Sequence, residues 1–585
     1  MRLSAWAVAG CAWLLAGAAW AQRPSEEDIF GGGGEGASGN PAPVSATATA
    51  TATATTTATT TSTTTATTTT AVTATTAATP RAAGKAAGMA EDAAAGNARA
   101  DGRDELNLGN PEAATRFSAE VAPADPLRIG GQFYWRVMGS AKQGQAPQNW
   151  GLSAPALVDI YLDARPNDRV RAYVLGRMFY DPTLPASASV TAGSPSGAAS
   201  AQSTDFLGSS SAQQTQGPTV LLDQAWLRAD ILRTVFVTAG KQHARWGTAR
   251  FWAPTDYLHM VPRNPLLPFD SRTGTTMLKL HVPWEDRGWN FYAYGLPNGP
   301  DTSSNQTFKT GDVAGAVRAE VVLGTLEAGL GAFAQRHSKA KFAGDVSFGL
   351  WDLDFYGEAA LRNAGDVDFV RFESRGLVDS SGTGFGPYTN SHGVPVDVTS
   401  VPSIVDAYFP VHRGSGWKAQ ATGGVSYTRQ YADKDTFTVG AEYFYNGLGY
   451  DDPRVYPAVL PFLPHASPLA NPATFFYLGR HYLGVYATAP APYSWDNTTF
   501  TLSTLSNLSD KSGITRLDYS LVVLTHLRFE AYGAVHWGQR NGEFRFGVDG
   551  SALANTNVKK VNDLAGSLNI PPAVFDLGVG LRVAL

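Results

Sequence analysis

The last fifteen residues of the chain, from Pro571 to Leu585, constrain its fold more than any other stretch. Every second side chain from Phe575 onward is large and apolar, and the side chains between them are small or polar. Because successive side chains of a strand point to opposite faces, this pattern predicts a strand with one wholly apolar face. In a soluble sheet such a strand leaves an edge open to aggregation, whereas a closed barrel in a lipid bilayer has no edge and requires an apolar outer face.

Alternation of the same kind recurs along the chain and predicts an all-β fold, an antiparallel transmembrane β-barrel. About 18 strands are expected, an even number as in single-chain bacterial barrels. The alternation is weakest near 342–350 and 498–508, so 16 strands is the alternative count. The predicted strands cover 128–138, 156–165, 169–180, 219–230, 235–246, 275–282, 288–296, 313–323, 326–336, 342–350, 354–363, 416–429, 436–446, 474–487, 498–508, 513–524, 528–538 and 572–585.

Connections of two kinds alternate between these strands. One kind is short and rich in turn formers, as in Pro166-Asn167-Asp168. In bacterial barrels the short turns face the periplasm and the long loops face outside, so both ends of the predicted barrel are expected on the periplasmic side. The long loops are predicted over about 181–218, 247–274, 364–415, 447–473 and 539–571.

The N-terminus predicts export from the cytoplasm. Arg2, the apolar stretch after it and the small residues of Ala19-Trp20-Ala21 are typical of a secretory signal peptide over residues 1–21. The alternative is lipoprotein processing at Cys11, because Val8-Ala9-Gly10-Cys11 resembles a lipobox. With cleavage after Ala21 the mature chain has no cysteine, which excludes disulfides and thiolate metal sites.

Two further regions come after the predicted signal. Residues 22–126 include a nearly pure Thr/Ala tract and cannot bury enough apolar surface to fold. We therefore expect a disordered Thr/Ala-rich periplasmic segment, which serves either as a flexible tether or as an arm that binds a partner. Residues 127–585 are predicted to form the outer-membrane β-barrel.

Composition and motifs exclude several classes of protein. Beyond the predicted signal no run reaches the roughly eighteen apolar residues that a membrane-spanning helix requires. The net charge of −5 indicates no particular partner, and nothing points to nucleic acid. No catalytic motif or phosphate-binding loop is present, so we expect neither an enzyme nor a cofactor. His243 and His281 lie on neighbouring predicted strands, but nothing supplies a third ligand, so no metal site is predicted.

Charged side chains collect on the inward parity of the predicted strands. Lys241, His243 and Arg245 share one face of the strand predicted over 235–246, where they form a positive stripe. One interpretation is an anion-facing wall, because a ring of like charge in a pore selects the opposite charge. The other is a network that maintains the barrel shape, in which the cations pair with Asp230, Glu320, Glu327, Glu358 and Glu442. The predicted pore-lining residues are Arg171, Arg177, Arg228, Lys241, His243, Arg245, Lys279, His281 and Glu442.

Two other sets of residues on the predicted strand faces bear on function. Asp223 and Gln242 fall on the presumed lipid-facing side, where polar groups are unexpected. Aromatic residues fall on the inward side, where they permit stacking on sugars; they are Tyr134, Tyr173, Trp226, Tyr292, Tyr356 and Tyr532.

Several short motifs carry a resemblance. They are Gly240–Gly247 (GKQHARWG) with Pro254-Thr255-Asp256 and Asn264-Pro265-Leu266, Glu442–Tyr450 (EYFYNGLGY) and Gly479–Leu483 (GRHYL). These stretches resemble segments of large porin-like outer-membrane β-barrels of Gram-negative bacteria, nearest in type to the alginate- and polysaccharide-export barrels. The C-terminal strand also resembles the insertion signal of such barrels, with Leu585 in place of the usual final Phe.

The resemblance implies an eighteen-stranded channel in the outer membrane, in contact with outer-membrane lipid. Such a channel passes polar or anionic solutes, or a secreted polysaccharide. In the second case periplasmic export proteins are the expected partners. The alternative is a structural barrel with a plugged lumen inside a motility or adhesion complex of the envelope, to which residues 22–126 connect it.

Overall fold

The structure is a computed structural model of the chain. The described residues are 126–183, 218–259, 262–267, 272–300, 313–336, 338–372, 388–389, 395–396, 411–431, 435–459, 476–547 and 571–584. The predicted signal and the predicted Thr/Ala-rich segment lie outside these residues and remain predictions.

The main sheet holds 19 strands, of which β2 (Gly151–Ser153) is a short strand beside β1. The other 18 form a closed antiparallel barrel in which each strand pairs with the next. The strands of the barrel are β1 (Leu127–Lys142), β3 (Ala156–Asn167), β4 (Val170–Tyr180), β5 (Thr219–Ile231), β6 (Val235–Gln242), β7 (Thr275–Trp284), β8 (Trp289–Pro300), β9 (Ala314–Leu323), β10 (Leu326–Gln335), β11 (Lys341–Leu350), β12 (Leu353–Asn363), β17 (Trp417–Gln430), β18 (Thr436–Asn446), β19 (His481–Pro490), β20 (Thr498–Asn507), β21 (Ser512–Leu524), β22 (Leu527–Gly538) and β23 (Ala573–Ala584).

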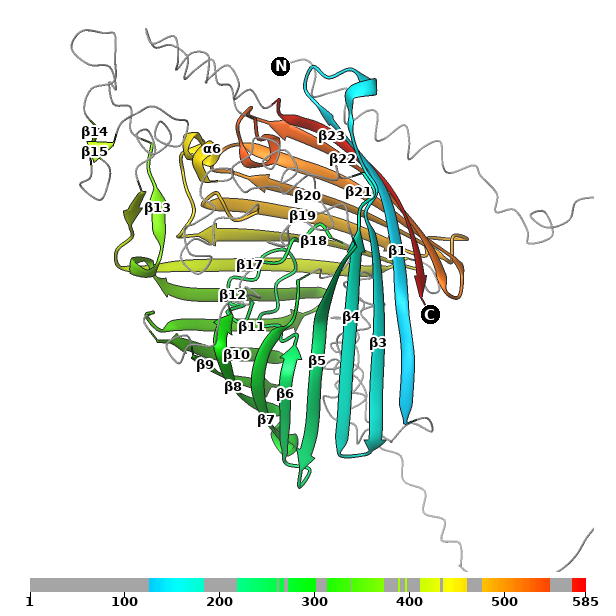
Figure 1. The fold of residues 1–585 in the computed structure, drawn as a ribbon, viewed down its shortest axis with the longest axis vertical. Helices are drawn as coiled ribbons and strands as arrows, with labels where there is room; N and C mark the ends of the chain where they lie inside the picture. The colour runs from blue at the N-terminus through cyan, green and yellow to red at the C-terminus, as the bar shows by residue number, and fades with distance from the viewer. Residues whose placement is uncertain are drawn as a thin grey trace, which may run out of the picture. The chain divides into compact units, whose positions relative to one another are not determined.

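The first and last strands close the barrel. β23 pairs antiparallel with β22 on one side and with β1 on the other, in a register that places Val583 opposite Phe133 and Leu577 opposite Gly139. Figure 1 shows β1 in cyan beside β23 in red where the sheet meets itself. Closure gives every strand two neighbours, so the barrel presents no open sheet edge to the lipid.

Short elements decorate the loops. Two small two-stranded sheets pair β13 (Asp368–Val370) with β16 (Val411–Arg413) and β14 (Tyr388–Thr389) with β15 (Pro395–Val396). The helical elements are α6 (Tyr456–Val459) and the 3-10 turns η2 (Pro147–Asn149), η3 (Glu285–Arg287), η4 (Ala364–Asp366), η5 (Pro453–Val455) and η6 (Glu543–Arg545). Among the described residues, no helix has the length and apolar character needed to cross a membrane.

The predicted strand count of 18 is confirmed, because the segments near 342–350 and 498–508 form β11 and β20. Four predicted strands have an end that is wrong by four residues or more. Those predicted over 128–138 and 288–296 continue to Lys142 and Pro300. The strand predicted over 235–246 ends at Gln242, and the one predicted over 474–487 begins at His481. Before His481 the chain makes a tight crossing, since a Cβ on Gly449 would lie 2.0 Å from the Gly479 carbonyl oxygen.

The outer face of the barrel is an apolar belt. The exposed large apolar residues include mid-strand side chains from all round the ring, as expected for a face that contacts lipid. Examples are Phe133, Trp135, Ile160, Val174, Leu227, Leu278, Val317, Leu330, Phe342, Leu483, Val485, Leu502, Leu517 and Val579.

The two polar exceptions to this belt face the interior. The β4–β5 register shifts between Leu175 and Gly176, which inserts Asp223 as an extra residue. This bulge leaves both Asp223 and Gln224 buried. Gln242 is also buried, and its side-chain amide donates to the Met277 carbonyl oxygen at 3.2 Å.

Short turns gather at one end of the barrel and longer connections at the other. β3 and β4 are joined by two residues and β9 and β10 by two residues, whereas β6 and β7 are separated by residues 243–274. β1 begins and β23 ends at the short-turn end, because Leu127 pairs with Ala164 and Ala584 pairs with Gln132. Both ends of the barrel domain therefore lie on the same side as the short turns.

A charge placed on the lipid-facing side tests this arrangement. Val317 and Leu323 share one face of β9 and are each 57% exposed, but Val317 lies nearer the middle of the strand. We expect Val317→Arg to destabilise the folded barrel by about 2–4 kcal/mol and Leu323→Arg by about 0–1 kcal/mol, because the cost depends on depth in the bilayer. Urea unfolding in lipid vesicles measures both. Equal costs at the two positions would contradict the membrane placement of β9.

Candidate functional site

The connection between β6 and β7 folds into the barrel. Trp246 is fully buried in a cluster with Tyr257, Tyr294 and Phe333, which reaches the wall formed by β8 to β10. Six residues later, Trp252 is fully buried in a second cluster, where it stacks on Phe444 of β18 at a centroid distance of 5.6 Å. Residues 246–252 thus bridge two walls of the barrel, and we call the described residues of this connection, 243–259, 262–267 and 272–274, the inner loop.

Two wall carboxylates hold the inner loop. Glu358 of β12 accepts from the Ala249 N–H at 2.6 Å and from the Thr255 hydroxyl at 2.7 Å. Glu442 of β18 accepts from the backbone N–H groups of residues 250–252. Both carboxylates are buried, so the loop amides replace the water that would otherwise solvate them.

One glycine allows this close approach. Gly247 has φ +96°, and a Cβ there would lie 2.3 Å from a Glu358 oxygen. Any side chain at this position would collide with the carboxylate and strain the backbone.

An internal ion network stabilises the return of the loop. Asp256 is buried and contacts His259 at 3.1 Å and Arg272 at 2.9 Å. Burial alone would raise the pKa of Asp256, but His259 and Arg272 outweigh it and hold that pKa at about 2.

The predicted arginines of β4 face the interior but are paired with acids. Arg171 makes two bonds to Asp163, at 2.8 and 2.9 Å. Arg177 contacts Asp159 at 2.7 Å and Asp223 at 3.2 Å. On this wall the network interpretation therefore describes the geometry, although the acids are not the ones predicted from the sequence.

The predicted positive stripe does not exist. Lys241 pairs with Ala225 and Thr276 on the outward face of the sheet, where its Nζ donates to the Leu222 carbonyl oxygen at 2.6 Å. The inward side chain at this end of β6 is its neighbour, Gln242. Lys241 shares its face of β6 with Val235, Val237 and Ala239, which lie beside the outward Leu227 and Leu278. The prediction of an inward Lys241 is wrong because it grouped Lys241 with His243 and Arg245, which lie beyond the end of the strand.

His243 and Arg245 lie in the inner loop beyond β6. His243 contacts the buried Asp223 at 3.1 Å and stacks on His259 at a centroid distance of 5.7 Å. Arg245 donates to the Ala249 carbonyl oxygen at 2.9 Å. Both side chains therefore serve the local structure of the inner loop.

The remaining predicted cations lie along the inner wall among aromatic rings. The Arg228 guanidinium lies 4.7 Å from the centre of the Phe236 ring, and Lys279 lies 5.8 Å from that of Tyr292. His281 stacks on Tyr292 at 4.5 Å and contacts Asn290 at 2.9 Å. His281 pairs with Phe236 at the start of β6, whereas His243 comes after its end, so the two histidines are not brought together.

A pocket on the wall from β19 to β1 collects arginines that come from distant parts of the sequence. Its end at β19 lies opposite β6, nine strands away in either direction round the ring of 18. It contains about 680 Å³ of space, including space open to the lumen. Its side chains include four arginines, two carboxylates and several hydroxyls, namely Arg136, Arg250, Arg528, Arg582, Asp518, Glu530, Thr488, Thr499, Thr501, Ser520 and Tyr532. We call it the arginine pocket.

Positive charge exceeds negative charge in the arginine pocket. Its four guanidinium groups face two carboxylates, an excess of two positive charges. Arg528 and Arg582 are direct cross-strand partners, an arrangement that is unfavourable for like charges. Glu530 offsets part of this cost with a 2.7 Å contact to Arg582. A cluster that disfavours folding in this way is a candidate for function.

Aromatic faces support the guanidinium groups. Arg136 lies 5.4 Å from the ring centre of Tyr134 and 5.0 Å from that of Tyr532. Arg250, which belongs to the inner loop, lies 3.8 Å from the ring centre of Tyr486. The pocket is therefore made by the wall and the inner loop together. Arg250 and Arg528 are partly exposed, whereas Arg136 and Arg582 are buried behind them.

Sequence reasoning missed this pocket. Arg136 and Arg528 fall on the predicted inward parity, but nothing in the sequence places them beside Arg582 or Arg250. The available signal was the closure of the barrel, because the ring order makes β22, β23 and β1 neighbours. Glu442 was predicted to line the pore; it points inward, but the inner loop covers it.

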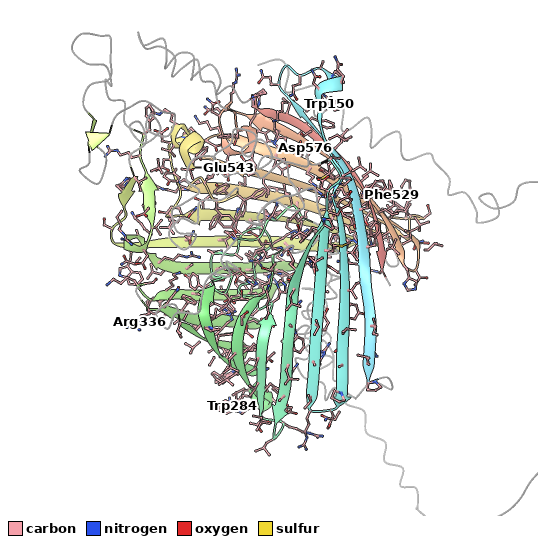
Figure 2. The ribbon with its side chains drawn as sticks, in the orientation of Figure 1. Trp150, Trp284, Arg336, Phe529, Glu543 and Asp576 are labelled. Atoms are coloured by element: carbon pink, nitrogen blue, oxygen red, sulfur yellow. The ribbon has the colours of Figure 1, made fainter. Side chains whose placement is uncertain are left out.

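Another buried carboxyl group, that of Glu543, lies in the connection between β22 and β23. Glu543 accepts from the Tyr482 hydroxyl at 2.6 Å and from the Asn507 side-chain amide at 2.8 Å. Figure 2 shows Glu543 and Asp576 at the long-connection end of the barrel. Burial, aided by the carboxylate of Asp510, raises the pKa of Glu543 to about 8.

Metal ligation finds no support in the described part of the chain. No group of three or more His, Cys, Asp or Glu residues there is arranged to hold a metal ion.

Comparison with known proteins gives similarity in fold. No family model matches the chain, and no curated protein matches it in sequence. Among solved structures, OccAB4 of Acinetobacter baumannii shares 8% identity over 79% of this chain and 98% of its own, with a TM-score of 0.41. OpdL of Pseudomonas aeruginosa shares 8% identity over 78% and 98%, with a TM-score of 0.39. A triple mutant of the Rhodopseudomonas blastica porin shares 10% over 78% and 100%, with a TM-score of 0.34.

The strand pairing by itself establishes the predicted fold, a closed antiparallel β-barrel. At these identities no residue role is carried over from the solved structures.

The ion network of β4 predicts a large structural effect. Arg177→Met leaves two buried carboxylates, Asp159 and Asp223, without their guanidinium. We expect it to lower the free energy of unfolding by roughly 3–5 kcal/mol, measured by chemical unfolding. The control Arg233→Met removes an exposed pair with Asp168 and should cost less than about 1 kcal/mol. Similar costs for both variants would show that the β4 network does not stabilise the barrel.

The raised pKa of Glu543 predicts that the stability of the loop containing it depends on pH. Because its pKa is raised in the folded state, its contribution to stability is present below its unfolded value, near 4.5, and is lost as the pH rises through about 8. The amides near Glu543 should therefore be better protected from hydrogen exchange at pH 6 than at pH 9.5. Protection here is the ratio of the exchange rate in unstructured peptide to that in the protein at the same pH. Glu543→Gln should remove this difference. A pH dependence that persists in this variant would assign it to another group.

Proposed function

We propose that this protein is an outer-membrane channel for small polar solutes and that its lumen favours anions. The single observation that carries the preference is the arginine pocket, in which four guanidinium groups face two carboxylates at the place where the inner loop approaches the opposite wall. Fixed positive charge in a low-dielectric channel attracts anions and repels cations.

The membrane placement rests on the apolar belt and on closure of the sheet. Exposed apolar side chains on the outer face would be unfavourable in water, and the closed ring satisfies the backbone where water is absent. We assign the short-turn end, and with it both ends of the barrel domain, to the periplasm, as is usual for bacterial barrels. Residues 22–126 then extend into the periplasm as a tether or a partner-binding arm.

Export of a secreted polysaccharide is the finer alternative, and it would involve periplasmic export proteins. The aromatic rings on the inner wall favour it, since Tyr161, Tyr173 and Trp226 form a continuous stack at 5.9 and 5.5 Å. The inner loop disfavours it, because Phe251 and Trp252 are packed in the interior and a polymer would have to displace them. Small solutes are therefore the preferred substrate class.

Reversal potentials in planar bilayers test the proposal. In a salt gradient the wild-type protein should prefer anions, and this preference should weaken with salt because the Debye length falls from about 10 Å at 0.1 M to about 3 Å at 1 M. Arg528→Gln should lower the preference by roughly half, since it removes one of two excess charges. Lys241→Gln, which removes an outward charge, should leave it unchanged.

Three results would overturn the proposal. A wild-type channel that prefers cations, or one whose preference is unaffected by Arg528→Gln, would show that the arginine pocket does not select the permeating ion. A purified, folded barrel without conductance would favour the structural role in an envelope complex with a plugged lumen.

A further inference from the structure

The Glu442 carboxylate accepts hydrogen bonds from three successive backbone N–H groups of the inner loop. The donors are the N–H groups of Arg250 at 2.9 Å, Phe251 at 3.2 Å and Trp252 at 2.9 Å. Successive N–H groups that converge in this way form an anion-binding concavity in the backbone. Here the bound anion is a side chain of the barrel wall, and it is 1% exposed.

Two further donors fix the carboxylate itself. The Tyr356 hydroxyl donates to it at 3.0 Å from β12, and the Thr422 hydroxyl donates at 3.2 Å from β17. Hydrogen bonds from the barrel wall thus fix the Glu442 side chain independently of its bonds to the loop. Through Glu442, the rigid sheet therefore fixes the positions of the three loop amides.

The neighbours of Arg250 are also confined. A Cβ on Gly484 would lie 2.5 Å from the Phe251 ring, so this ring lies directly against the β19 backbone. The Trp252 indole donates to the Phe476 carbonyl oxygen at 3.0 Å. With its backbone bound by Glu442 and its successors packed, Arg250 extends towards Tyr486 and lines the arginine pocket.

We propose that Arg250 is a specificity-determining residue of the channel and that Glu442 is its positioning residue. The arginine pocket is then a two-part site for small anions, with one part built into the wall by Arg136, Arg528 and Arg582 and the other supplied by the inner loop. This inference rests on the proposed anion preference. It adds that the preference depends on a buried carboxylate that never meets the permeating ion.

The sign of the effect separates positioning from simple electrostatics. Glu442→Gln removes a negative charge from the interior, which by itself would strengthen a preference for anions. If Glu442 positions Arg250, the same substitution releases the loop backbone, because an amide cannot replace two acceptor oxygens, and the preference falls. The charge-matched control is Glu320→Gln, an inward carboxylate of β9 that binds Arg318.

Planar-bilayer recordings in potassium chloride, on the full-length protein, give the first readout. Arg250→Gln and Glu442→Gln should each lower the anion-to-cation permeability ratio by roughly half, and the double variant should equal Arg250→Gln alone, since residues that act as a unit are not additive. Glu320→Gln should leave the ratio unchanged or raise it. A ratio that is unchanged or raised in Glu442→Gln, while Arg250→Gln lowers it, would overturn the positioning role.

Hydrogen exchange of the amides of residues 250–252 gives a second readout that does not depend on conductance. These amides should exchange faster in Glu442→Gln than in the wild type, and Glu320→Gln should not change them. Unchanged protection would overturn the inference even in a barrel that does not conduct. If Arg528→Gln lowers the anion preference and Arg250→Gln does not, the proposed function stands and the role of Arg250 falls.

Discussion

Pairing of the first strand with the last is the constraint on which the rest of this structure depends. A backbone polar group without a partner in a bilayer costs several kcal/mol, so a sheet that meets lipid must close. The β1–β23 pairing closes it, and closure then divides every strand into an outward and an inward face. The outward residues must be apolar, and the polar residues of the strands are directed to the lumen.

Inside the barrel, the arginine side chains of two walls have different partners. On the wall from β3 to β5 each arginine of β4 meets aspartates on a neighbouring strand, which gives a rigid and nearly neutral surface. On the wall from β19 to β1 arginines outnumber acids and are held partly by aromatic faces. The inner loop contacts both of these neighbouring walls, through His243 at Asp223 of β5 and through Arg250 at Tyr486 of β19. The carboxylates that hold the loop lie on β12 and β18. Selectivity and loop position are therefore coupled through backbone amides.

The sequence predicts the barrel well because a period of two, repeated over about ten residues, is hard to produce in any other fold. It fails at β6, where alternation continues beyond Gln242 although the chain has left the sheet to enter the lumen. It also fails at Lys241, because the charged residues His243 and Arg245, which lie beyond the strand, share its parity, whereas Val235, Val237 and Ala239 within β6 put that parity on the outward face. The arginine pocket could not be predicted from the sequence for a different reason. Parity tells which way Arg136 and Arg528 point, but only the ring order and the path of the inner loop bring them near Arg250.

The location of anions in the lumen decides whether the arginine pocket selects the permeating ion. Crystals of the protein soaked in bromide reveal bound anions by anomalous scattering. We expect bromide in the arginine pocket, between Arg250 on the inner loop and Arg528 on β22. Bromide confined to the paired arginines of β4, or absent from the pocket while bound elsewhere in the lumen, would contradict the proposed anion site.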